Sequence, residues 1–281
     1  MTTEVAPIRN LRFNLDWITR PVFGIALAAV AIGSLASGRW YFAGFVAAGA
    51  IGALREWHRM VDRGAFAHEF WLSAATILVA LVGLLMAPDG EAAGLILIAG
   101  FLAVMISARA RGAAFVWHAA GVLYVGVPAL LLVALRDTGA HGAWIIAGFL
   151  LIVWATDTGA LIAGNLIGGP KLWPSLSPNK TWSGTLGGIA AAVAIESIYI
   201  GALGGELMPT ILYAALVASV AHGGDLFESA VKRFFSVKDS GGLIPGHGGV
   251  LDRIDSTLAV ATVLGVCVLG AGFDPMFGAH P

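Results

Sequence analysis

Long apolar runs separated by short polar segments make up most of the chain. Nine such runs are about 15 to 26 residues long, and a helix needs about 20 apolar residues to cross the hydrocarbon core of a bilayer. The pattern therefore predicts an all-α polytopic integral membrane protein with about nine transmembrane helices. The predicted spans are residues 21–37, 40–54, 70–87, 93–108, 113–135, 142–167, 184–203, 207–227 and 254–273.

The second run is the shortest, which affects the count of crossings. As a helix it would measure about 23 Å, less than a hydrocarbon core of about 30 Å. The first two runs could therefore form a hairpin that does not fully cross the membrane.

Lysine and arginine are distributed unevenly among the segments between the runs. With a cytoplasmic N-terminus, 14 of the 16 basic residues fall on the inner side, and only Arg39 and Arg136 fall outside. An excess of basic residues on the cytoplasmic side is the signal that sets membrane orientation. We therefore expect the N-terminus and the polar segments near the C-terminus to face the cytoplasm.

Composition leaves no room for a separate soluble domain. Charged residues make up 12% of the chain, about half the share in a soluble domain. We divide the chain into an N-terminal transmembrane part, residues 1–140, and a C-terminal transmembrane part, residues 141–281, that carries most of the chemistry. Cys267 is the only cysteine, which excludes an intrachain disulfide and a cysteine metal cluster.

Three carboxylates fall inside apolar spans, where lipid contact would cost about 2.5 to 3.5 kcal/mol for each of them. For Glu196 we expect structural pairing inside the bundle, whereas Asp157 and Asp225 are candidates for chemistry. His222, Asp225, Ser229 and Lys232 are spaced by three and four residues, which places them on one helix face. If that helix runs unbroken to about residue 235, the stripe extends to the cytoplasmic boundary.

Three polar segments combine cations, hydroxyls, carboxylates and glycines. Residues 177–184 precede an apolar helix, and free backbone donors at a helix start favour anions. In residues 238–249, glycines let the main chain approach a ligand closely. Residues 252–255 then open the last span with two carboxylates and an arginine. This combination is typical of nucleotide phosphate transfer with a divalent ion.

No general base or covalent nucleophile is evident in these segments. A phosphate monoester that attacks another phosphate needs no base, because its second pKa of about 6 leaves it mostly dianionic at pH 7. Catalysis would then depend on positioning and charge neutralisation.

The segment from Ser229 to Asp255 resembles the signature of the phosphatidate cytidylyltransferase (CDP-diacylglycerol synthase) family. Its fixed positions read Ser-x2-Lys-Arg-x4-Lys-Asp-x-Gly-x2-Ile-Pro-x-His-Gly-Gly-x2-Asp-Arg-x-Asp. Trp154-x2-Asp157-Thr-Gly-Ala, Ser177-Pro-Asn-Lys-Thr181 and Gly224-Asp225-Leu226 are also similar to family motifs. The resemblance is strong over residues 151–255, whereas the first 140 residues match only in their pattern of spans.

The resemblance implies an enzyme of the inner membrane that transfers a cytidylyl group from CTP to phosphatidic acid, with Mg²⁺, as a homodimer and without a nucleic acid partner. It leaves open a second, monovalent cation. It implies that Asp225 and Asp252 hold the metal, and we assign Lys232, Arg233 and Lys238, with these two aspartates, to catalysis. The expected substrate-binding residues are Asp157, Ser177, Asn179, Lys180, Thr181, Ser229, Asp239, His247, Gly248, Gly249, Arg253 and Asp255. His247 would contact the nucleotide or only shape the glycine loop.

Two other functions fit parts of the pattern. A secondary transporter can hold its substrate at a glycine-rich break in a helix, although such a site is expected near the membrane midplane. A CTP-dependent polyprenol kinase would use related chemistry but release CDP, whereas a cytidylyltransferase releases pyrophosphate. A CDP-alcohol phosphotransferase is disfavoured because the sequence has no Asp-Gly-x2-Ala-Arg motif.

Overall fold

Helices form almost the whole structure, a computed structural model that describes residues 16–63, 68–139, 141–243, 248–270 and 272. The predicted all-α class is confirmed. The elements are α1 (Asp16–Ser37), α2 (Arg39–Asp62), α3 (His68–Met86), α4 (Glu91–Ala110), α5 (Phe115–Arg136), α6 (Gly142–Leu166), β1 (Lys171–Trp173), β2 (Ser177–Thr181), α7 (Trp182–Ala202), α8 (Leu207–Phe234) and α9 (Leu251–Gly265), which continues as a π-helical turn, Val266–Gly270.

Seven helices in the described part of the chain are long and apolar enough to cross a membrane. They are α3 to α8, together with α9 and its π-helical turn. Helix α2 is longer than its predicted span, which covered only the apolar residues. The helix continues for two more polar turns, from Arg55 to Asp62. Crossing of the membrane by α1 and α2, and the cytoplasmic N-terminus, stay predictions; Arg9 and Arg12 lie outside the described residues.

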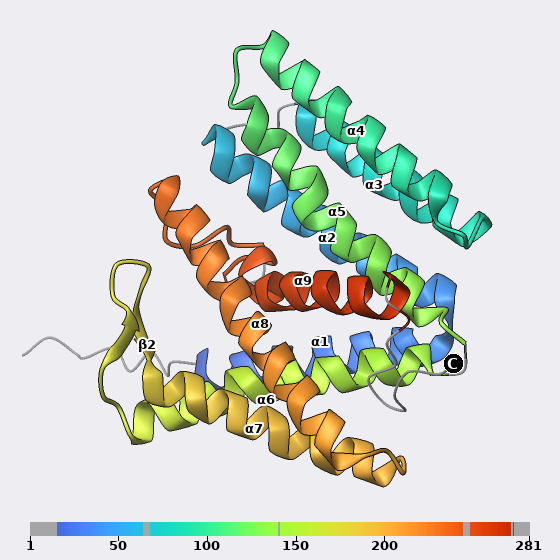
Figure 1. Ribbon diagram of the computed structural model, residues 1–281. Helices are drawn as coiled ribbons and strands as arrows, with labels where there is room; N and C mark the ends of the chain where they lie inside the picture. Colours follow the sequence, from blue (N-terminus) through green and yellow to red (C-terminus); the bar gives the residue numbers. More distant parts are fainter. Residues whose placement is uncertain (1–15, 64–67, 140, 244–247, 271, 273–281) are drawn as a thin grey trace, which may run out of the picture.

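The helices form two groups joined by α9. Figure 1 shows α2, α3, α4 and α5 side by side in one group, and α6 and α7 side by side in the other, crossed by α8. Helix α9 lies between the groups and packs against α2, α5 and α8. The buried core follows this contact, with Trp57 from α2, Phe149 from α6 and Leu251 from α9 each no more than 1% exposed.

Glycines let α6 and α7 approach closely. A Cβ atom on Gly159 would lie 2.5 Å from the Ala191 Cβ, and one on Gly187 would lie 2.2 Å from the Ala163 Cβ. Neither position has room for a side chain. Close helix contact through small residues is the usual packing mode in lipid.

A short antiparallel hairpin connects α6 to α7, and the sequence analysis did not predict it. Strands β1 and β2 pair Lys171 with Thr181 and Trp173 with Ser177. The hairpin lies at one end of the α6–α7 pair (Figure 1). Residues 177–181, which precede the predicted helix, form strand β2, and α7 begins directly after them at Trp182.

Candidate active site

A cavity of about 560 Å³ opens where α6, the hairpin, α7 and α8 meet. Most of its lining residues are glycines, which leave room for a ligand, or polar residues, which can bind one. The lining residues are Asp157, Ala160, Leu161, Gly164, Asn165, Gly168, Gly169, Lys171, Asn179, Lys180, Thr181, Gly184, Thr185, His222 and Asp225. Five predicted site residues therefore share one cavity, namely Asp157, Asn179, Lys180, Thr181 and Asp225.

An ion pair between Lys180 and Asp225 crosses this cavity. The Lys180 Nζ lies 2.5 Å from the Asp225 Oδ2, and the two side chains are 21% and 33% exposed. The other carboxylate oxygen of Asp225 accepts a hydrogen bond from the Ser229 Oγ at 3.4 Å. The predicted stripe on α8 is thus confirmed at these positions. Both residues line the cavity, where the Asp225 carboxylate covers the buried Lys180 Nζ.

The start of α7 fixes the position of Lys180. Thr181 is the N-cap of α7, and its Oγ1 accepts a hydrogen bond from the Gly184 N–H at 3.1 Å. A threonine cap satisfies one of the free donors of the first turn. The Ser183 hydroxyl donates to the Gly168 carbonyl, which ties the cap to the end of α6. Lys180, one residue before the cap, therefore enters the cavity from a rigid support.

A second ion pair joins α8 to the start of α9. The Lys232 Nζ lies 2.7 Å from the Asp252 Oδ1, and it also pairs with Glu228 one turn earlier on α8. Asp252 accepts two backbone hydrogen bonds as well, from the Ser240 N–H at 3.1 Å and the Gly249 N–H at 3.0 Å. Lys232, assigned to phosphate neutralisation, is therefore shared between two carboxylates here.

Glu56 is a site residue that the sequence analysis missed. It lies on α2, is 1% exposed, and its Oε2 accepts hydrogen bonds from the Ser240 Oγ at 3.1 Å and the Leu251 N–H at 2.9 Å. The segment between α8 and α9, residues 235–250, is called the signature loop below. A buried carboxylate of the N-terminal part thus binds this loop at Ser240 and the residue that follows the loop, Leu251. Glu56 lies among three arginines, Arg55, Arg59 and Arg63, at the polar end of an apolar run. This position could have indicated a site residue, but the arginines served only as evidence of membrane orientation.

The other predicted site residues lie in several places around these two ion pairs. Ser177 is half-buried in β2 and does not line the cavity. Arg233 donates to the Val237 carbonyl at 3.1 Å, and Lys238, Asp239 and Arg253 are exposed. Asp255 is 8% exposed and accepts from the Ser256 N–H at 2.6 Å. Gly248 has a φ of +83°, which favours glycine, while His247 lies outside the described residues.

The carboxylates of the cavity suit a hard cation by their chemistry. Asp157 and Asp225 line the cavity, and Asp255, buried at the start of α9, lies within electrostatic reach of both. In the residues that the structure describes, no group of three or more acidic, histidine or cysteine side chains is arranged to hold a metal ion. Mg²⁺ commonly binds through one or two carboxylates plus substrate phosphates, so Asp225 fits this role. A cation shared by Asp225 and Asp252 stays a prediction.

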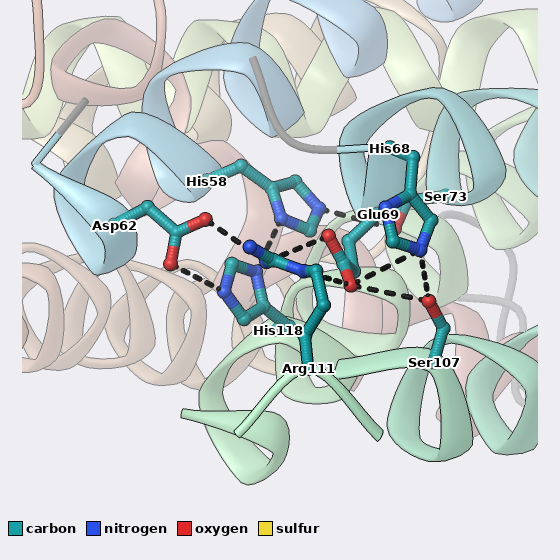
Figure 2. Close-up of polar contacts among 8 residues, drawn as sticks. All are labelled: His58, Asp62, His68, Glu69, Ser73, Ser107, Arg111 and His118. Atoms are coloured by element: carbon teal, nitrogen blue, oxygen red, sulfur yellow. Dashed lines mark hydrogen bonds and ion pairs between the residues drawn. The ribbon is translucent and has the colours of Figure 1, made fainter. Parts of the chain in front are cut away.

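A separate polar cluster links α2, α3, α4 and α5 (Figure 2). His58 and His118 stack with their Nδ1 atoms 2.7 Å apart, and the His118 Nε2 lies 2.9 Å from the Asp62 Oδ1. Arg111 binds both oxygens of Glu69, at 2.9 and 2.8 Å. The sequence analysis assigned no role to these histidines.

The chain matches the model of the cytidylyltransferase family over residues 18–269. It is similar to the phosphatidate cytidylyltransferase of Brucella suis biovar 1 (strain 1330), at 49% identity over 151 residues, 53% of this chain and 55% of that protein. The enzymes of that name from Staphylococcus haemolyticus (strain JCSC1435) and Bacillus subtilis (strain 168) are 41% and 38% identical over 150 and 144 residues. These segments are 53% and 50% of this chain and 56% and 54% of those proteins. The chain therefore spans about half the length of the curated relatives it matches.

Proposed function

The chain belongs to the cytidylyltransferase family, and we propose that it transfers a cytidylyl group from CTP to phosphatidic acid. A phosphate oxygen of the lipid attacks the α-phosphorus of CTP and forms a new P–O bond. The bond between the α-phosphorus and the bridging oxygen breaks, and its electron pair leaves with pyrophosphate. The products are CDP-diacylglycerol and pyrophosphate.

The observation that carries this proposal is the Lys180–Asp225 pair in an open cavity. In the proposed reaction the triphosphate enters beside Lys180, and the lysine exchanges the carboxylate for a phosphate oxygen. Lys232, two helical turns after Asp225 on α8, and the backbone donors of the signature loop hold the Asp252 carboxylate in place. The names of the relatives, phosphatidate cytidylyltransferase, support the choice of substrates.

Asp225 and Asp252 would hold Mg²⁺, which supplies charge neutralisation on the triphosphate when it is bound. No residue of the chain has to remove a proton, since the attacking phosphate monoester is mostly dianionic at pH 7. The residues of the chain bind and orient the two substrates in line. The asymmetric distribution of basic residues supports a site that faces the cytoplasm and an inner-membrane location, and we retain the homodimer as part of the proposal.

The rival transporter function depends on a broken helix at a glycine-rich site. Helix α8 instead runs from Leu207 to Phe234 and passes through Gly223 and Gly224 without a break. The cavity lies beside the hairpin and the start of α7, at helix ends. Both features favour an enzyme that works at the membrane surface.

Incorporation of label into lipid tests the proposal. Purified protein in detergent micelles would be incubated with Mg²⁺, CTP labelled in the cytosine ring, and phosphatidic acid, and then extracted with chloroform. We expect the base label in the lipid phase only when phosphatidic acid is present, and none with diacylglycerol or a polyprenol. No incorporation with phosphatidic acid would contradict the proposal and favour transport, whereas phosphorylation of the polyprenol would identify a kinase.

A further inference from the structure

The last two turns of α2 present two polar faces that differ in how they are used. His58 and Asp62, four residues apart, face α3 and α5 within the cluster of Figure 2. Glu56 and Arg59, three residues apart, share another face of the helix, and Arg63 follows directly as the C-cap residue and lines the same cavity as Arg59. This second face lies against the signature loop, because Glu56 binds Ser240 and Leu251.

The first face is closed. One proton arrangement satisfies every partner: the Ser73 hydroxyl donates to the His58 Nε2, the His58 Nδ1–H donates to the His118 Nδ1, and the His118 Nε2–H donates to Asp62. His58 and His118 are 3% and 0% exposed. These contacts fix the rotation of α2, and that rotation determines where the second face points.

A cavity of about 530 Å³ lies between the second face and the signature loop. Two guanidinium groups and one carboxylate line it, so its side chains carry a net positive charge. Its lining residues are Arg59, Met60, Arg63, Val237, Asp239, Ser240, Gly241 and Gly242. Arg59 is exposed, and the Arg63 Nη2 donates to the Phe235 carbonyl at 3.0 Å, which anchors this guanidinium at the rim.

The loop closes tightly on α2 at this point. A Cβ atom on Gly241 would lie 2.4 Å from the Glu56 Oε1, and one on Gly249 would lie 2.5 Å from the Glu56 Oε2. The Ser240 N–H on the same loop donates to Asp252. The cavity is therefore connected to the Asp252 end of the candidate active site through Ser240, a lining residue that binds both Glu56 and Asp252.

We propose that this cavity is a second anion site, in which Arg59 and Arg63 bind a phosphoryl group. Arginine presents a planar fork of donors that matches phosphate oxygens. The proposed reaction joins two phosphate-bearing substrates that repel each other, so it needs cations in addition to Lys180. Lys180 lines one cavity, and Arg59 and Arg63 line another that contacts Asp252 through Ser240. The ligand's identity, the phosphate of a lipid or of a nucleotide, rests on the proposed function, whereas the anion site itself does not.

Binding measurements without turnover test this inference. Arg59→Gln would be compared with wild type and with Arg109→Gln, a matched loss of one exposed arginine at the end of α4. Three probes would be used separately: Mg²⁺-CTP by calorimetry, inorganic pyrophosphate by calorimetry, and phosphatidic acid by native mass spectrometry. Loss of one charge-assisted contact should weaken binding about tenfold or more. Arg109→Gln should bind all three probes as wild type does.

The pattern of losses identifies the ligand. Weaker binding of phosphatidic acid alone assigns the cavity to the lipid phosphate, and weaker binding of CTP or pyrophosphate assigns it to the nucleotide. Wild-type affinity of Arg59→Gln for all three probes would overturn the inference. If wild type binds neither CTP nor phosphatidic acid, the proposed function fails, and the pyrophosphate titration still decides the anion site: it stands if Arg59→Gln weakens that binding and is overturned otherwise.

Discussion

The histidine cluster of α2 to α5 and the candidate active site are built from the same kinds of side chain, but they differ in what remains available to a ligand. In the cluster, Arg111 binds both oxygens of Glu69, and His118 is fully buried against Asp62. In the site, Lys180 and Asp225 are paired yet still border an open cavity. The cluster's ion pairs join helices and stabilise their contact, whereas the Lys180–Asp225 pair lines a cavity in which a substrate can replace one partner.

Asp225→Asn and Asp252→Asn, both in the candidate active site, should lower turnover more than any other substitution proposed here. Each variant removes a negative charge from the proposed site, so we expect turnover to fall below about 1% of wild type, a loss typical of groups that stabilise transferring phosphates. Initial rates of CDP-diacylglycerol formation measure the effect, and gel filtration and helical circular dichroism check the fold. If both variants retain more than a few per cent of activity while folded, the metal assignment is wrong.

Lys180→Met removes the cation that faces the cavity. The neutral side chain cannot bind a phosphate oxygen, and we expect kcat/KM for CTP to fall about 100-fold, the order of magnitude of a lost charged contact in a phosphate site. Arg109→Gln, which removes a cation far from the cavity, is the matched control and should leave kcat/KM unchanged. Equal rates for Lys180→Met and wild type would show that the pair with Asp225 is only structural.

Glu56 lies on α2, between the histidine cluster and the loop that leads to α9. Two substitutions of Glu56 should show whether it positions the loop or acts through its charge. Glu56→Ala removes the acceptor of Ser240 and Leu251, so the signature loop loses its anchor and kcat should fall about tenfold. Glu56→Gln keeps a carbonyl oxygen that can accept both hydrogen bonds, and it should restore most of the rate. A Gln variant as slow as the Ala variant would instead point to a role for the negative charge.

The histidine cluster should affect stability more than the rate, because none of its residues lines the candidate active-site cavity. Burial, and then the neighbouring His118, lower the pKa of His58 to about 3 from its ordinary 6.5. As the pH falls below 6.5 the unfolded chain takes up a proton that the folded chain does not, so the free energy of unfolding falls by up to about 1.4 kcal/mol per pH unit.

His58→Gln removes this proton uptake, so its stability should depend less on pH. Between pH 7 and pH 5 the wild-type melting temperature should fall about 4 °C further than that of the variant. Melting in detergent at each pH measures the difference, with His141→Gln, outside the cluster, as control. Equal pH dependence of wild type and His58→Gln would contradict a neutral buried His58.

Local patterns predicted much of this molecule. The apolar runs predicted the helices because run length and helix length are linked in a membrane protein. Helices α3 to α7 begin and end within two residues of the predicted spans, whereas α8 continues to Phe234, past its predicted apolar end at residue 227. The spacing of Asp225 and Ser229 predicted their contact, since four residues make about one helical turn.

Long-range contacts and weakly patterned strands were not predictable in this way. The β1–β2 hairpin has short strands without alternating apolar residues, so no periodicity marks it. Glu56 and Ser240 are 184 residues apart, and nothing local to either indicates the other. The pairing of Lys232 with Asp252 likewise depends on how α9 docks against α8, whereas its pairing with Glu228 is local, four residues apart on α8.

The fate of each phosphorus atom of CTP tests the central claim most directly. Parallel reactions with phosphatidic acid would contain CTP labelled at the α-phosphorus or at the γ-phosphorus. The proposed transfer predicts α-label in the lipid product and γ-label in pyrophosphate, in equal amounts. Label from the γ-phosphorus in lipid, with CDP as the second product, would contradict cytidylyl transfer.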